Sequence, residues 1–210
     1  MTTMLFTIED QVACVEREIR QLRKPPIRIP LSNEFTLIVE ERDLWIFGYW
    51  NWGVRNNKGN RTAYLYRRKG GKGYHFHREV IAAPPEYLVD HINHNGLDNR
   101  RSNLRLVTHK QNMWNVAPKN NKKYKGVELH KFSGLWRATL RNHEDLYICT
   151  YHKTEEEAAR AVDEAYRNHY GEFAYQNFPT TDPVERNLAL WEAVLATLKQ
   201  IQSPKLPLLL

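Results

Sequence analysis

Apolar residues near both ends of the chain recur every three or four positions, which is the spacing of one face of a helix. Near the N-terminus they follow a Thr7–Asp10 helix start and end at Pro25-Pro26. We therefore expect an amphipathic helix there, used for packing or self-association. A second helix should start at Asp182-Pro183 and dock on a neighbour. The apolar positions are Val12, Val15, Ile19 and Leu22 in the first, and Leu188, Trp191, Val194, Leu195, Leu198 and Ile201 in the second.

Between residues 35 and 66 the pattern changes to short apolar runs that predict strands. These runs are Phe35–Val39, Leu44–Trp50 and Ala63–Tyr66. We interpret Trp45, Trp50 and Trp52 as core or sheet-face residues. The basic stretch Arg67–Gly73 lacks the Lys-Ser/Thr ending of a nucleotide-binding loop, so it predicts a hairpin tip that is available to DNA phosphate.

The pattern in the middle of the chain predicts a strand, a polar loop, a short apolar segment that is buried in the core, and a helix. The strand Glu86–Val89 follows two prolines and ends on the adjacent pair Asp90 and His91. Asn95-Gly96 is the turn signal of the loop, and Leu104, Leu106 and Val107 return the chain to the core. Thr108 and Gln111 form a capping box, which places Asn112 on the first helical turn, facing the strand end.

These residues predict a metal-assisted phosphodiesterase site. Asp90 and the amide oxygen of Asn112 are hard ligands suited to Mg²⁺. His91 has the pKa range of a general base, and Asn103 could fix its tautomer. Taken singly, the neighbouring polar residues are explained by turn formation alone; these are Asn93, His94, Asn95, Asp98 and Asn99.

Composition narrows the class of protein and partner. The 210 residues, 41% of them hydrophobic, suffice for one large or two small domains. The net charge is +7, and residues 55–125 hold 16 Lys and Arg against 4 Asp and Glu, which favours double-stranded DNA as partner. Cys14 and Cys149 offer no disulfide framework. We find no signal peptide and no membrane segment, so we expect an intracellular, cytoplasmic protein.

After a basic connector at 118–125, the chain predicts a second module. The strands are Tyr124–Leu129, Trp136–Arg141 and Leu146–Tyr151, and a helix capped by Thr154 follows and ends at Gly171. Three antiparallel strands backed by one helix are implied. Arg137, Thr139 and Arg141 share one face, which could enter a DNA major groove.

At Asp90-His91, Asn103 and Asn112 the chain resembles the HNH endonuclease family, in the phage and intron homing branch where Asn replaces the last motif His. His77-Arg78, expected on the preceding hairpin, Asn99-Arg100-Arg101 and Asn103-Leu104-Arg105 extend the resemblance. It implies a ββα-metal fold, Mg²⁺ or Mn²⁺, products with 5′-phosphate and 3′-hydroxyl ends, and a phage or bacterial source. His109 remains an alternative to Asn112. Without paired Cys-x-x-Cys motifs, no structural zinc is expected.

Residues 124–179 are similar to the ethylene-response-factor (Apetala-type) DNA-binding domain. The matching segments are Tyr124–Val127, Gly134–Ala138, Glu156–Asp163 and Asn177–Pro179. Where plant members usually have Arg after Gly-Val, this chain has Glu128, so Arg137 and Arg141 become the better candidates for base contacts.

The sequence thus predicts an α+β protein that hydrolyses DNA and finds its site through the C-terminal module. Its predicted divisions are an N-terminal helix (1–26), the HNH domain (27–118), the Apetala-type domain (119–179) and a C-terminal helix with tail (180–210). No small-molecule cofactor and no membrane partner are expected. The alternative is a DNA-binding regulator with a vestigial nuclease pocket. The predicted DNA contacts are Arg78, Arg100, Arg101, Arg105, Lys110, Lys125, Arg137, Thr139 and Arg141.

Overall fold

The structure is a computed structural model that describes residues 7–32, 34–56, 62–118, 122–141, 146–179 and 182–202. The chain divides into two compact units. The first unit comprises Met1–Ala82, Asn95–Leu104 and Thr181–Leu210, and the second comprises Ala83–His94 and Arg105–Thr180. The predicted connector residues 119–121 lie outside the described residues, so the boundary between 118 and 119 stays a prediction.

Two small antiparallel sheets form the base of the first unit. One pairs β1 (Ile27–Ser32) with β2 (Phe35–Val39), and the other has the order β3 (Gly53–Arg55), β4 (Tyr64–Lys69), β5 (Lys72–His75). Short helices α2 (Leu44–Tyr49) and α3 (Phe76–Val80) accompany them. Leu37, Leu65 and Phe76 are fully buried. These side chains supply the apolar core that the first unit needs.

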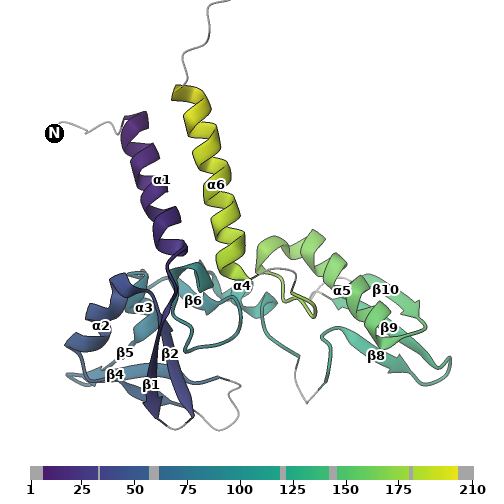
Figure 1. The fold of residues 1–210 in the computed structure, drawn as a ribbon. Coiled ribbons are helices and arrows are strands. Elements are labelled where there is room, and N and C mark those ends of the chain that lie inside the picture. Colours follow the sequence, from purple (N-terminus) through teal and green to yellow (C-terminus); the bar gives the residue numbers. More distant parts are fainter. Residues whose placement is uncertain are drawn as a thin grey trace, which may run out of the picture. The chain divides into compact units, whose positions relative to one another are not determined.

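Two long helices of the first unit pack against each other, as Figure 1 shows in purple and yellow. They are α1 (Ile8–Leu22), capped by Thr7, and α6 (Pro183–Gln202). Val15 and Ile19 of α1 are buried, and ion pairs such as Lys199–Glu16 at 2.8 Å join the two helices. Both predicted terminal helices are confirmed. Ile201, predicted on the apolar side of the second, is 60% exposed.

The second unit begins with the predicted strand and helix of the motif. β6 (Leu88–His91) pairs with β7 (Leu104–Val107), and α4 (His109–Trp114) follows with its capping box between Thr108 and Gln111. Leu104 and Val107 are buried as predicted, but Leu106 is 40% exposed because it alternates to the outer face of the strand.

The rest of the second unit is a three-stranded antiparallel sheet backed by one helix, as the pattern predicted. The strands β8 (Val127–His130), β9 (Leu135–Arg141) and β10 (Leu146–His152) have the order β10-β9-β8. Helix α5 (Glu155–Tyr170) is capped by Thr154 and ends at Gly171, which has φ of 59°. Its apolar side packs with Ala138 and Leu140 of β9. All the apolar positions predicted for α5 are buried: Ala158, Ala159, Val162, Ala165 and Tyr166.

Two predictions of local structure are wrong. Residues Leu44–Tyr49 form α2, not a strand, because a continuous apolar run does not distinguish a strand from a short buried helix. Trp45 of this helix is 68% exposed and so is neither a core nor a sheet-face residue. Residues His77-Arg78 lie in α3, not on the hairpin, because the hairpin strand β5 ends at His75 and the fully buried Phe76 anchors the next helix.

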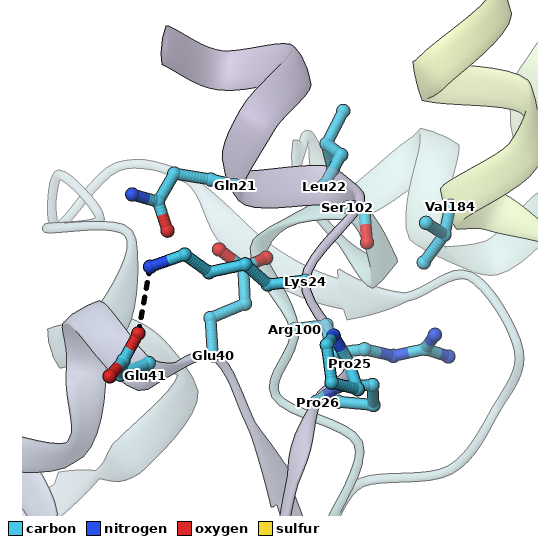
Figure 2. A pocket seen from close by; sticks show the side chains of 10 residues that line it. All are labelled: Gln21, Leu22, Lys24, Pro25, Pro26, Glu40, Glu41, Arg100, Ser102 and Val184. Atoms are coloured by element: carbon cyan, nitrogen blue, oxygen red, sulfur yellow. Dashed lines mark hydrogen bonds and ion pairs between the residues drawn. The ribbon is translucent and has the colours of Figure 1, made fainter.

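A small cavity in the first unit is lined by Leu22, Glu40, Arg100, Ser102 and Val184, among others (Figure 2). Its volume of about 50 Å³ has room for little more than a few water molecules. Its charged groups have partners within the protein, for example Lys24 with Glu41 at 2.8 Å. The cavity is therefore a packing feature and not a substrate pocket.

The loop that contains Gly96 packs closely against Ala63 within the first unit. A methyl group at Gly96 would come within 2.5 Å of the main-chain oxygen of Ala63. Gly96→Ala should therefore cost about 1–3 kcal/mol of unfolding free energy. Gly48→Ala is the matched control, since nothing lies within 4 Å of the added methyl group. As a helical Gly→Ala change it should stabilise by about 0.5–1 kcal/mol. Urea unfolding of both variants measures the difference, and equal midpoints would refute the close fit.

Candidate functional site

Strand β6 places Asp90 and His91 side by side at its end. Their exposed fractions are 9% and 5%, so both side chains are buried. Helix α4 packs against this strand, as expected for a strand–helix arrangement. The second unit therefore holds a carboxylate and an imidazole next to a helix that carries amide side chains.

One carboxylate oxygen of Asp90 is the centre of a hydrogen-bond cluster. Arg105 donates to Oδ2 from Nε at 2.9 Å and from Nη2 at 2.8 Å. Asn115 also donates to Oδ2, from Nδ2 at 2.8 Å. In the described part of the chain, the other carboxylate oxygen, Oδ1, accepts no hydrogen bond. The carboxylate is thus fixed through one oxygen while the other remains an unused acceptor.

Arg105 is held in place by more than Asp90. Its Nη1 donates to the main-chain oxygen of Glu172, and its guanidinium lies 5.1 Å from the ring centroid of Phe173. Only 11% of its side chain is exposed. Arg105, predicted to contact DNA, is therefore a buried partner of Asp90 in this structure.

Asn112 lies in α4, and Asn115 follows directly after the end of this helix. The two residues are three positions apart, and residues at this spacing lie on the same side of a helix. Because Asn115 contacts Asp90, this spacing predicts that the half-buried Asn112 also faces β6. His109 is exposed and lies six residues from Asn115, which places it well off that face. The helix geometry thus favours Asn112 over His109 as the last motif residue, and the assignment stays a prediction.

Turn geometry accounts for His94. Its main-chain nitrogen donates to the oxygen of His91 at 3.0 Å, and its φ of 62° is left-handed. The imidazole lies 5.2 Å from the ring of Tyr175. These contacts fit the turn role that the sequence indicated.

Asn103 and its neighbours belong to the first unit. Asn103 is fully buried, and its Nδ2 donates to the main-chain oxygen of Asp98 at 2.8 Å. Residues of this loop extend the edge of β2, since Ile38 accepts from Asn99 at 2.7 Å and donates to Leu97 at 2.9 Å. The role predicted for Asn103, orientation of the His91 ring, stays a prediction.

The arginines that precede Asn103 are ion-paired. Arg100 donates to both oxygens of Asp98, at 2.8 and 2.6 Å. Arg101 does the same to the buried Asp43, at 2.9 and 2.7 Å. In each case the carboxylate hydrogen bond is the main cause that raises the arginine pKa. These two guanidiniums tie the loop to the first unit.

Two of the predicted DNA contacts of the C-terminal sheet, Arg137 and Thr139, also have partners within the protein. Arg137 donates to Glu128, its neighbour across β8 and β9, at 2.8 Å. Hydrogen bonds from Lys122 and Arg137 lower the pKa of Glu128. The Thr139 hydroxyl donates to the oxygen of Gly126 at 3.3 Å. The Arg141 side chain lies outside the described residues.

Lys125 is directed inward. Its Nζ donates to the oxygen of Trp114 at 2.7 Å and lies 5.0 Å from the ring centroid of Tyr166. Burial lowers the pKa of Lys125 to about 8. Of the remaining predicted contacts, Lys110 is exposed on α4 and Arg78 is half-buried in α3.

Sequence reasoning missed Asn115 and the contact between Arg105 and Asp90. The signal available for Asn115 was its position one helical turn after Asn112. The ion pair had no local signal, because Asp90 and Arg105 lie 15 residues apart and meet only through the pairing of β6 with β7.

The donor set fits a hard divalent cation better than zinc. Among the described residues, no three or more His, Cys, Asp or Glu side chains gather as a metal cluster. Asp90 Oδ1 is an anionic acceptor without a hydrogen bond from the described residues, and an amide lies on the adjacent helix face. One carboxylate and one amide suit Mg²⁺, which keeps several waters and takes other ligands from phosphate. Arg105 and Asn115 would then hold the Asp90 carboxylate in a fixed orientation for such a cation.

One comparison with known proteins gives a family match on the central motif, and another gives two partly covered relatives. The sequence model of the HNH endonuclease family matches residues 82–114. An uncharacterized HNH endonuclease of Acanthamoeba polyphaga mimivirus is 38% identical over 97 residues, covering 45% of this chain and 49% of that protein. Protein 3.8 of Escherichia phage T7 is 41% identical over 59 residues, covering 27% of this chain and 49% of that protein.

The chain spans about half the length of the curated relatives it matches. No solved structure gives a significant match. Among the described helices, none combines the length and apolar character needed to cross a membrane. The family match covers Asp90, His91, Asn103 and Asn112 together. Residues 82–114 therefore match the HNH endonuclease family, and it is in this segment that the chain is similar to that family.

Proposed function

We propose that the chain is a metal-dependent DNA endonuclease of the homing type, in which the HNH module cleaves and the C-terminal module finds the site. The observation that carries this proposal is the geometry of Asp90. Three hydrogen bonds from Arg105 and Asn115 converge on Oδ2, and no described residue donates to Oδ1. A carboxylate that is rigidly oriented through one oxygen is well prepared to bind a cation with the other.

The proposed roles follow from the chemistry of each residue. Asp90 and Asn112 hold one Mg²⁺ or Mn²⁺ ion, which when bound supplies positive charge beside the scissile phosphate. His91 accepts a proton from the attacking water, because an imidazole titrates near neutral pH. Its burial at the end of β6 restricts the ring to a few orientations, which favours directed proton transfer.

The C-terminal module is proposed to be an Apetala-type DNA-binding domain. Its three-stranded sheet and single helix support this proposal. The hydrogen bonds that hold its last segment, Asn177–Pro179, against α5 also support it. The buried carboxylate of Asp163 accepts from the main-chain nitrogens of Asn177 and Phe178, both at 2.8 Å. Site recognition would then fall to the outer face of β9. Glu128 neutralises Arg137 there, so that arginine must exchange its partner to read a base.

A second candidate function is a DNA-binding regulator without nuclease activity. The ion pair between Asp90 and Arg105 favours it, because a guanidinium already compensates the carboxylate charge that a cation would use. The two candidates agree on DNA as partner and differ in the need for metal. Cleavage therefore discriminates between them.

A plasmid nicking assay tests the proposal. The wild-type chain should nick supercoiled DNA in the presence of Mg²⁺ or Mn²⁺. Nicking should cease when excess chelator removes the metal. Asp90→Asn replaces an anionic ligand with a neutral one, so it should cut slowly and require more Mg²⁺ for its residual activity.

Glu128→Gln is the control, since it removes one carboxylate charge from the exposed face of the same unit. It should cut with the wild-type dependence on Mg²⁺. Undiminished cutting by Asp90→Asn at low Mg²⁺ would remove Asp90 from the metal site. Binding without cutting, over many DNA sequences, would favour the regulator.

A further inference from the structure

One face of the sheet β3-β4-β5 gathers aromatic and basic side chains outside the HNH module. In the strand register, Arg55 lies opposite Tyr64, and Gly53 and His75 lie on either side of Tyr66. Because directly opposed residues share a face and alternate residues repeat it, Arg68 belongs to the same set. We call this set the tyrosine–arginine face: Gly53, Arg55, Tyr64, Tyr66, Arg68, Gly73 and His75.

Tyr66 orients the two arginines of this face. Arg68 donates from Nε to the hydroxyl oxygen of Tyr66 at 3.0 Å. The guanidinium carbon of Arg55 lies 5.3 Å from the centroid of the same ring. The Nη groups of Arg68 have no hydrogen-bond partner among the described residues. An open groove runs between the two arginines, with Gly53 and Val54 in its lining.

Arg68 of this face has no carboxylate partner among the described residues. In the described part of the chain, Arg68 has no ion pair, and no Asp or Glu lines the groove. Arg67, on the opposite face of β4, contrasts with it, because it pairs with Glu79 at 2.9 Å. Burial, followed by the charges of Arg55 and Arg78, lowers the pKa of His75.

Glycines on the neighbouring strands leave space for the Tyr66 ring on this face. A methyl group at Gly73 would lie 2.6 Å from the Tyr66 hydroxyl, so this ring packs directly over the glycine. Gly53 opposes Tyr66 on the other strand and adds no side chain to the floor. An open groove lined by two arginines suits an extended polyanion better than an enclosed base.

We propose that the tyrosine–arginine face binds the sugar–phosphate backbone of duplex DNA, with Arg55 and Arg68 each contacting one phosphate. This rests on the proposed function for the identity of the polyanion and adds a second contact surface to it. The arginines nearest the motif, Arg100, Arg101 and Arg105, are bonded to carboxylates. The tyrosine–arginine face therefore supplies phosphate contacts that those residues do not, independent of base sequence.

The test measures binding without cleavage. Fluorescence anisotropy of a short duplex, in chelator and at several salt concentrations, gives the slope of log affinity against log salt. The double variant Arg55→Gln/Arg68→Gln should reduce the steepness of this slope by about 1.8, because each lost phosphate contact contributes about 0.9. Each single variant should show half of this change. The single variants therefore still test the proposal if the double variant does not fold.

The control variant Arg17→Gln/Arg20→Gln removes the same charge from exposed positions on α1. Its slope should equal the wild-type slope. Arg68→Lys keeps a point charge and should retain the slope, whereas Tyr66→Phe should retain the slope but weaken binding about 2- to 10-fold, since it removes the acceptor that orients Arg68.

An unchanged slope in the folded double variant, or an equal loss in the α1 control, overturns the proposal. The outcome is separable from that of the proposed function. Metal-dependent nicking by the wild type with an unchanged slope in the variant rejects only the tyrosine–arginine face. A reduced slope in a protein that never cuts supports this face and rejects the nuclease.

Discussion

His91→Ala should lower the rate of DNA cleavage by about 10²–10⁴-fold, the usual contribution of a general base, while DNA affinity stays at the wild-type level. The His91 side chain is buried at the end of β6, so its loss removes no exposed positive charge from the surface. Nicking at saturating Mg²⁺ and gel shift in chelator measure the two properties on one preparation. Cleavage at a near-normal rate would make His94 or His109 the next candidate.

The matched comparison is Arg137→Ala in the C-terminal sheet. It should leave the chemistry of the bound complex intact and cost about 1–3 kcal/mol of binding to a preferred site, if this arginine reads a base edge. Glu128→Gln removes its ion-pair partner and should strengthen binding instead, because Arg137 is then no longer neutralised. Unchanged site preference in both variants would mean that β9 is not the reading surface.

Elements with strong local signals could be predicted from the sequence. Capping boxes at Thr7, Thr108 and Thr154 mark the starts of three helices, and each of them forms in the structure. The reason is that a cap satisfies main-chain groups of the same short segment, so its pattern is visible locally. The alternation over Trp136–Leu140 was informative for the same reason, since one face of a strand is buried.

Elements that depend on tertiary context could not be predicted. The apolar run Leu44–Trp50 has no dominant period, and the helix it forms is fixed by contacts such as the one from Trp52 Nε1 to the oxygen of Ile46. Strand β1 was missed because it contains Pro30, which is tolerated there since the sheet has only two strands and both are edges.

In the candidate site, too, features with a local sequence signal could be predicted and features that depend on tertiary contacts could not. Residue types at fixed spacing pointed to Asp90, His91 and Asn112, and the family match covers all three. The charge count between residues 55 and 125 described the basic character but not which arginines are available. Arg100, Arg101 and Arg105 are paired with carboxylates, and only the structure distinguishes them from Arg68, which has no ion pair among the described residues.

The buried pair of Asp90 and Arg105 leads to the second large effect, one on stability. Removing one member leaves the other charge in a site where side-chain exposure is only about a tenth. Asp90→Asn or Arg105→Met should therefore cost about 3–5 kcal/mol of unfolding free energy. The double variant should cost less than the sum of the two, because neither charge is then left alone.

The exposed pair of Glu128 and Arg137 in the same unit is the control. Its side chains are 47% and 34% exposed, so Glu128→Gln should cost about 0.2–1 kcal/mol. Urea unfolding of all variants measures these differences. If Asp90→Asn costs no more than Glu128→Gln, the ion pair contributes little to the fold. If it costs the larger amount, nicking by Asp90→Asn must be compared at a temperature where the variant is fully folded, so that lost cleavage reports the metal site and not unfolding.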